Sequence, residues 1–344
     1  MSEKEETRKI QFTGNSSYIV SLPKRWVTDL GLRRGDQIRI TRNSSTLQIF
    51  PPQVREGGAP KEDATIEIRA DEDPQPTVRR LISLYFLGFR TIHVVPKEGW
   101  LRPEQRASIK EAVRRMLMGT EIISDSRNGM TLQVLVSLLE LTVDGAFKRM
   151  IHLAKMMLSD AIAAVERENL ALAREVIDTD DEVDRFGFYI IRQLKMAIQN
   201  EHMLKEVGFR DARSCLGYRL VVKSIERTGD HASLIARDLL EYGGVGGPTM
   251  SKIKEMSQFA VSLLDDACLS LFTEDYEQAE KTIKSSEEIS AYETRVMETT
   301  KKTGEPGVYR IRRTTENIRR IAEYASDIAE IVLNMTIEKT LKKA

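Results

Sequence analysis

The sequence is poor in the residues that mark secreted proteins and membrane proteins. Its 344 residues include only two cysteines, Cys215 and Cys268, and four histidines. Both cysteines lie in apolar, helix-like patterns, so we expect reduced packing residues of a cytosolic protein and no disulfide framework. No apolar run reaches the roughly 18 residues that a membrane span needs. The longest candidate, 130–143, is interrupted by Gln133 and Glu140, which predicts no membrane insertion.

The chain also lacks an apolar segment behind its charged start, MSEKEETRK. This pattern predicts that the chain has no signal peptide and is located in the cytoplasm. Aromatic residues make up only 6% of the chain, which favours helix packing by Leu, Ile, Met and Ala. With 41% apolar and 30% charged residues, the composition is typical of a soluble globular protein of two or three domains.

A net charge of zero conceals an uneven distribution of charge along the sequence. Residues 7–55 carry nine Lys and Arg against two Asp and Glu, whereas residues 145–344 carry thirty against thirty-three. A basic head therefore precedes a mildly acidic body. We expect only the head to meet nucleic acid.

The head, residues 7–53, contains short strand patterns broken by turn residues. We expect strands at 8–13, 18–23, 37–42 and 46–50, a short helix at 24–31, and a Pro/Gly linker at 51–60. Four short strands in fewer than 50 residues give too small a core for a stable monomer. The head is therefore expected to dimerise.

The order of these features, RKIQFTGNSSYIVSLPKRWVTDLGLRRGDQIRI, resembles that of the SpoVT/AbrB-type swapped-hairpin domain. The resemblance implies an interlocked homodimer whose hairpins form a β-barrel, and DNA binding through residues near the loops. The alternative is that the head only dimerises and its arginines form a solvated surface. Candidate DNA contacts, mainly to phosphates, are Lys9, Asn15, Ser16, Ser17, Lys24 and Arg25.

The middle region, residues 62–138, predicts a small α/β domain. The expected order is β-α-β-α-β-β, with strands at 64–70, 90–95, 119–126 and 130–136 and helices at 76–89 and 102–118. It contains no phosphate-cradling glycine loop and no triad-like grouping. We expect a spacer or a docking domain.

The body, residues 139–344, is helical throughout, with apolar residues at i, i+3, i+4 and i+7. A glycine-rich connector divides it into two parts, 139–241 and 250–341. Each part predicts three long helices, at 139–166, 169–204 and 210–241, and at 250–272, 275–301 and 307–341. Equal lengths and order predict an internal duplication.

Paired carboxylates recur in the third helix of each half. Glu226 and Asp230 are four residues apart, as are Glu323 and Asp327, so each pair shares one helix face. Like charges at this spacing repel, and a bound cation would relieve the repulsion. The alternative is a pair of solvated faces that arginine residues neutralise.

The segments SIERTGDHASLIA and RRIAEYASDIA resemble the acidic motifs of the PhoU family, a tandem of three-helix bundles, and RDAR at 210–213 also fits. The resemblance implies clusters of iron, zinc or similar metals. The candidate ligands include no cysteine, and their hard oxygen atoms favour magnesium, calcium, manganese or iron. In the second half, Arg319 and Ser286 depart from the pattern, so a second site is doubtful. The implied ligands are Asp180, Asp184, Glu226 and Asp230, with Glu293, Glu323 and Asp327 remaining in the second half.

The resemblance implies a regulator of phosphate uptake that acts on the ATPase of a phosphate ABC transporter or on a signalling protein. The alternative is an AbrB-type DNA-binding transcription regulator, with the helical body as a metal- or phosphate-responsive effector domain. We expect no enzyme, because the body lacks a nucleophile–base pair, a cofactor loop and the Glu-x-x-His pairs of di-iron bundles.

Overall fold

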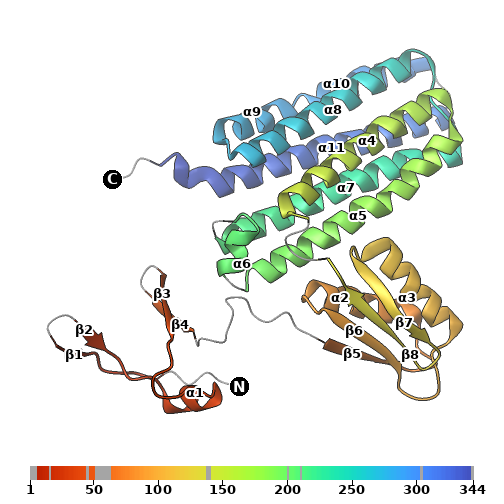
Figure 1. Ribbon diagram of the computed structural model, residues 1–344. Helices are drawn as coiled ribbons and strands as arrows, with labels where there is room; N and C mark the ends of the chain where they lie inside the picture. Colours follow the sequence, from red (N-terminus) through yellow and green to blue (C-terminus); the bar gives the residue numbers. More distant parts are fainter. Residues whose placement is uncertain are drawn as a thin grey trace. The chain divides into compact units, whose positions relative to one another are not determined.

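The computed structural model describes residues 6–14, 17–43, 46–50, 63–136, 141–199, 201–209, 211–302 and 305–341. The chain divides into two compact units, Met1–Ala59 and Pro60–Ala344 (Figure 1). It is mainly helical, with small sheets in the head and in the middle region, which confirms the predicted fold class. Within the described ranges, no helix combines the length and the apolar character that crossing a bilayer demands.

The head consists of two hairpins and one short helix. β1 (Gln11–Thr13) pairs with β2 (Ser17–Ile19), β3 (Arg39–Asn43) pairs with β4 (Thr46–Phe50), and α1 spans Lys24–Asp29. The two hairpins form separate sheets in the single chain. A two-stranded hairpin is marginally stable by itself, so the head needs further surface to pack against.

The head also exposes the apolar side chains that a core would bury. Ile10 and Tyr18 are 72% and 75% exposed. The Phe12 ring is tilted against the Tyr18 ring, with the two centroids 5.0 Å apart, and Phe12 is 59% exposed. Among the head residues whose burial is described, none is buried. Among the described residues of the head, the apolar alternation that predicted strands thus has no buried core to pack into.

The middle region follows the predicted element order. It contains β5 (Asp63–Ile68), α2 (Pro74–Phe86), β6 (Thr91–Pro96), α3 (Pro103–Met116), β7 (Thr120–Ser126) and β8 (Gly129–Val134). The sheet order is β5-β6-β8-β7, with β5 parallel to β6 and the other neighbours antiparallel. Leu81, Ile92, Ile109 and Leu132 form part of the core between the sheet and the two helices.

Helix α5 (Leu170–Ala197) of the body packs against α2 and α3, so these two helices lie between the sheet and the body. Phe86 meets Phe188 edge-on at 5.2 Å. Arg192 is only 6% exposed, and its guanidinium donates to the main-chain oxygens of Tyr85, in the last turn of α2, and of Phe89, just beyond that helix. The middle region is therefore attached to the body by packing and by a buried cation at a helix C-terminus.

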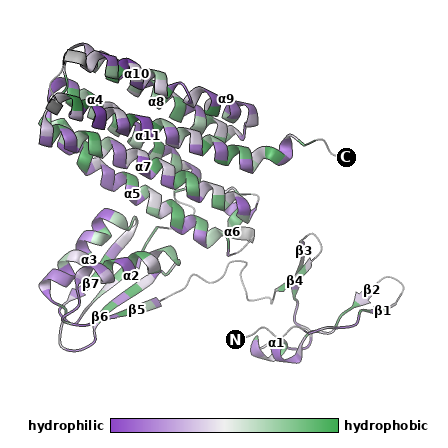
Figure 2. Cartoon of the chain, turned by 180° about the vertical axis from the view of Figure 1, so that it is seen from behind, coloured by the Kyte–Doolittle hydropathy of each residue, from purple (hydrophilic) through white to green (hydrophobic). Residues whose placement is uncertain are grey.

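The body contains two groups of helices that share one core. The first group is α4 (Val143–Arg167), α5, the short α6 (Glu201–Glu206) and α7 (Ala212–Tyr242). The second is α8 (Gly247–Thr273), α9 (Tyr276–Ser286), α10 (Ile289–Glu298) and α11 (Glu305–Thr336), with 3-10 turns at Thr299–Lys302 and Ile337–Lys339. In Figure 2, green apolar and purple polar residues alternate along these helices, as amphipathic packing requires.

The two groups repeat the same corner between their first and second helices. The residues that follow α4 and α8 directly, Glu168 and Glu274, both adopt left-handed φ angles, 48° and 51°. The next residues, Asn169 and Asp275, then cap the following helix by accepting main-chain N–H groups. Such a matched pair of unusual conformations is expected of a duplicated unit, and we name the two groups the first and second repeat.

Two predicted long helices are divided in the structure. The expected helix 169–204 becomes α5 and α6, and the expected helix 275–301 becomes α9 and α10, separated by a turn at Glu287 and Glu288. Just before that turn, the Ser286 hydroxyl donates to the carbonyl of Ile283. Serine hydroxyls that compete for main-chain groups weaken helix continuity, which periodicity does not reveal.

Helices α7 and α11 pack antiparallel and join the two repeats. Asp238 near the end of α7 accepts from Arg313 near the start of α11, at 2.6–2.9 Å. At the opposite ends, Gly217 lies against Met335. The last long helix of each repeat, α7 or α11, thus lies at the centre of the body (Figure 1).

Candidate cation-binding face

The four acidic residues predicted in the first repeat come together on α5 and α7. Asp180 and Asp184 lie one turn apart on α5, and Glu226 and Asp230 lie one turn apart on the adjacent α7. We call this group the first acidic face. The sequence spacing placed Glu226 and Asp230 on one side of their helix, and the family resemblance added Asp180 and Asp184. Packing of α5 against α7 brings the two pairs together.

Burial and mutual repulsion make these carboxylates unusual. Burial, followed by the charges of Glu226, Asp180 and Asp230, raises the pKa of Asp184 to about 7. Burial and then the charge of Asp230 raise the pKa of Asp180 to about 6. The first acidic face therefore holds more negative charge than its own surroundings neutralise.

One carboxylate oxygen of this face has no hydrogen-bond partner. The Oδ1 atom of Asp180 is buried and makes no hydrogen bond of normal geometry. The nearby Ser233 hydroxyl lowers the pKa of Asp180 through a contact that also falls short of normal hydrogen-bond geometry. Gly229 allows this approach, because a Cβ atom there would lie 3.2 Å from Asp180 Oδ1. Unpaired buried oxygens are costly and commonly have a water or an ion as partner.

The oxygen atoms of the first acidic face are of the kind that bind a hard cation, but they do not converge on one point. Carboxylate and hydroxyl oxygens are the ligands that magnesium, manganese and iron accept. Among the residues described, no three Asp, Glu, His or Cys side chains converge as a ready metal centre. Glu226 is instead paired with Lys223. Metal binding would require these side chains to turn toward Asp180.

The three acidic residues predicted in the second repeat lie in a different environment. Glu323 on α11 is paired with Arg319 and, at 2.9 Å, with Arg320. Glu293 on α10 is 3.8 Å from Arg319. Partial burial, Glu330 and Glu323 raise the pKa of Asp327, whereas Arg227 of the first repeat lowers it.

Sequence reasoning missed three residues of these faces. Lys223 and Glu316 lie three residues before Glu226 and Arg319, and both form ion pairs at that i, i+3 spacing. Ser233 follows Asp230 by three residues. The helical spacing could have identified all three, had basic and hydroxyl residues been placed on the same wheel as the acids.

The candidate DNA contacts lie in the head. Lys9, Ser17, Lys24 and Arg25 are all exposed, and Lys24 and Arg25 form the first turn of α1 after Pro23. Asn15 and Ser16 lie outside the described residues. The positive charges are thus on the surface, as contacts to phosphates require.

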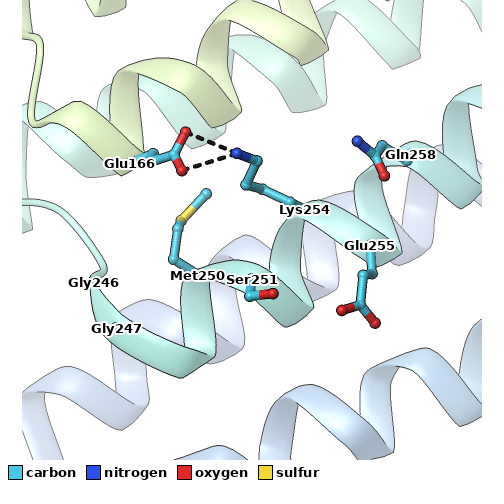
Figure 3. A pocket seen from close by; sticks show the side chains of 8 residues that line it. All are labelled: Glu166, Gly246, Gly247, Met250, Ser251, Lys254, Glu255 and Gln258. Atoms are coloured by element: carbon cyan, nitrogen blue, oxygen red, sulfur yellow. Dashed lines mark hydrogen bonds and ion pairs between the residues drawn. The ribbon is translucent and has the colours of Figure 1, made fainter.

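A separate cavity of about 480 Å³ lies where the end of α4 meets the start of α8 (Figure 3). Across it, Lys254 donates to both oxygens of Glu166 at 2.9 and 3.1 Å. Glu255, also in the lining, is paired with Lys252. The cations nearest to this cavity are already neutralised, so its charge favours no anion.

Comparison with known proteins gives the relationship of the helical body. A family model described as PhoU domain matches residues 147–239 and 253–332, one stretch in each repeat and together half of the chain. The chain belongs to the PhoU family. A second model, described as antidote-toxin recognition MazE, bacterial antitoxin, matches residues 11–56. A PhoU body with an AbrB-like head, as the sequence resemblance implied, is thereby confirmed.

A curated relative and two crystal structures belong to the same comparison. The phosphate-specific transport system accessory protein PhoU homolog of Aquifex aeolicus (strain VF5) is 28% identical over 142 residues. That stretch is 41% of this chain, and the chain spans 62% of the relative's length. PhoU from Pseudomonas aeruginosa aligns at 19% identity and a TM-score of 0.49, covering 57% of this chain and 96% of that one. The phosphate transport system regulatory protein PhoU from Streptococcus pneumoniae aligns at 17% and 0.48, covering 58% and 96%.

Proposed function

We propose that this PhoU-family chain is a non-enzymatic regulator of phosphate uptake and phosphate homeostasis. The observation that carries the proposal is the PhoU domain present twice in the helical body. A protein of this type would act by binding the ATPase of a phosphate ABC transporter or a signalling protein through its body, in the cytoplasm.

The test is phosphate uptake in cells that lack the protein. Labelled phosphate uptake would be measured in cells grown with scarce and with abundant phosphate, with and without the gene. We expect uptake to remain high in the mutant when phosphate is abundant, and to be restored to control by the full-length gene. Unchanged repression of uptake in the mutant would contradict the proposal.

We also propose that the first acidic face binds a metal ion, with iron, manganese, zinc and magnesium as the candidates. The ion would be held by the four carboxylates of this face, Asp180, Asp184, Glu226 and Asp230. It would neutralise their negative charge. Two observations support this assignment. The buried Oδ1 of Asp180 makes no hydrogen bond of normal geometry, and burial together with repulsion raises the pKa values of Asp180 and Asp184.

Elemental analysis of purified protein tests the metal. We expect a stoichiometric metal in the wild type and its loss in Glu226→Ala/Asp230→Ala. A matched control is Glu175→Ala/Asp178→Ala, which removes two exposed acids from α5. Equal metal content in all three proteins, or none in the wild type, would leave the first acidic face as a docking surface for partners.

A second candidate function is DNA binding by the head, which the exposed Lys24 and Arg25 favour. A transcription regulator of AbrB type would then use the body as its effector domain. Binding through phosphate contacts should weaken steeply as salt rises, and should weaken further in Lys24→Ala/Arg25→Ala. No binding of duplex DNA by the wild type at low salt would exclude this candidate.

A further inference from the structure

Arg319 stands at the position in the second repeat that Glu226 holds in the first. Superposing the two third-helix sequences aligns Ile318 with Ile225 and Arg320 with Arg227, which fixes this equivalence. A carboxylate of the first acidic face is therefore replaced by a guanidinium. The contacts of Arg319 show what that exchange does.

Arg319 is surrounded by three carboxylates from two helices. Its Nη2 atom lies 2.7 and 2.8 Å from the two oxygens of Glu316, and its Nε atom lies 3.1 Å from one of them. Its Nη1 atom donates to Glu323. Glu293, from α10, lies 3.8 Å away. The side chain is only 28% exposed, so these pairs are partly shielded from water.

Neighbouring arginines complete the neutralisation of this face. Arg320 donates to Glu316 at 3.1 Å and to Glu323 at 2.9 Å. Arg227 approaches Asp327 from α7. Four carboxylates of the second repeat thus meet three guanidinium groups, which carry a permanent positive charge. In the first acidic face, by contrast, four carboxylates meet two cations, Lys223, which is paired with Glu226, and Arg237, whose charge lowers the pKa of Asp180.

The second repeat therefore does not fit the metal that the family resemblance implies. Metal ligands need free oxygen lone pairs directed at one point. Here N–H groups of Arg319 and Arg320 already occupy oxygens of Glu316 and Glu323. A metal ion would also have to approach a fixed positive charge.

We propose that Arg319 is the built-in cation of the second repeat, taking the place of a metal ion, so that the chain keeps a metal site in its first repeat only. This inference uses the first-repeat metal site proposed above as its comparison. Its own test does not require the first repeat to bind a metal ion. The exchange makes the two repeats chemically unequal despite their common fold. Removing the guanidinium should open the second repeat to a divalent cation.

The test measures Mn²⁺ bound per chain by equilibrium dialysis of the full-length protein. We expect Arg319→Glu, which restores the carboxylate found at the equivalent Glu226, to bind one more Mn²⁺ than the wild type. Mn²⁺ should also raise the unfolding temperature of Arg319→Glu by more than that of the wild type. Arg312→Glu, which changes an exposed arginine of the same helix, is the matched control and should gain neither.

Three results would separate the two proposals. A folded Arg319→Glu protein with no extra Mn²⁺ would overturn the role of Arg319. The role of Arg319 would also be overturned if the wild type bound Mn²⁺ in its second repeat. In that case Glu226→Ala/Asp230→Ala would still bind the ion, and Glu323→Ala/Asp327→Ala would not. Absence of Mn²⁺ from the wild type with a gain in Arg319→Glu would support Arg319 while removing manganese from the first repeat. Arg319→Gln, which removes the charge at similar length, replaces Arg319→Glu in the same assay should the latter not fold.

Discussion

At the scale of single residues, Asp180 and Asp184 connect the structure to a measurable pH dependence. Their pKa values, about 6 and about 7, lie above those of ordinary carboxyls. In metal-free protein these two carboxyls therefore bind more protons in the folded chain than in the unfolded chain between about pH 4 and pH 7. Their contribution to stability should fall as the pH rises through this window.

Replacing Asp184 by Asn should remove part of this dependence. We expect Asp184→Asn to be more stable than the wild type at pH 8, by on the order of 1–2 kcal/mol after allowance for solvent screening. At pH 4 the folded chain holds the proton on Asp184, and about half of the unfolded chains hold it too, so the difference should be small. Urea unfolding with a chelator at both pH values measures it.

The control for that measurement is Asp178→Asn, an exposed acid two turns earlier on the same helix. It should change stability by less than about 0.5 kcal/mol at either pH. If Asp184→Asn shows the same small effect at pH 8 as at pH 4, the carboxylates of the first acidic face do not repel each other as described.

At the scale of helices, Arg192 is the contact that fastens α5 to the end of α2. Its guanidinium reaches two main-chain oxygens and lies 4.8 Å from the centre of the Tyr85 ring. Burial lowers the pKa of Arg192, yet no carboxylate is among the partners that the structure shows for it. The negative ends of the carbonyl dipoles at the C-terminal end of α2 thus stabilise its positive charge.

Replacing Arg192 by Met keeps the apolar length of the side chain and leaves both carbonyls without this donor. We expect a loss of about 1–3 kcal/mol in the free energy of unfolding. Urea unfolding followed by circular dichroism measures the loss. Arg174→Met, an exposed change on the same helix, should stay near the wild type. Equal stability of the two variants would show that Arg192 does not fasten the helices.

Most elements could be predicted from the sequence, because their apolar periods are regular. The β-α-β-α-β-β order and the third helix of each repeat followed from alternation and from the i, i+3, i+4 pattern. The division of α9 from α10 could not, since periodicity continues across the turn at Glu287. Nor could the contact of Arg192, because its partners are main-chain atoms more than 100 residues earlier.

The candidate site shows the same limit. Spacing placed Glu226 beside Asp230 on one helix face, but which residues neutralise which acids depends on side-chain direction. Arg319 was recognised as a departure from the pattern, and the structure adds that it contacts Glu316 and Glu323. The partner oxygens of Arg319 could have been inferred from i, i+3 and i, i+4 spacing. Glu293 could not, because it comes from another helix.

At the scale of the whole molecule, the head predicts the oligomeric state. Its two hairpins expose Phe12, Tyr18 and Ile40 in a unit with too few strands to bury them. We expect a homodimer in which a second head covers these residues. Phe12→Asp/Tyr18→Asp should convert the dimer to a monomer, measured by light scattering after size-exclusion chromatography.

The control for the dimer is Trp100→Asp, which changes an equally exposed aromatic residue outside the head. This variant should remain dimeric. A dimer that survives Phe12→Asp/Tyr18→Asp would place the self-association surface in the second unit, and the exposed head strands would then need another partner.

A head without a core of its own has a consequence for how partners are bound. Under the proposed function, pairing of two heads would tether two helical bodies, so that a first contact of one body with its partner protein would raise the local concentration of the second body. Two individually weak contacts would then hold with an avidity that neither has alone. Dilution of the protein, by separating the heads, would weaken that hold far more steeply than the affinity of one body suggests.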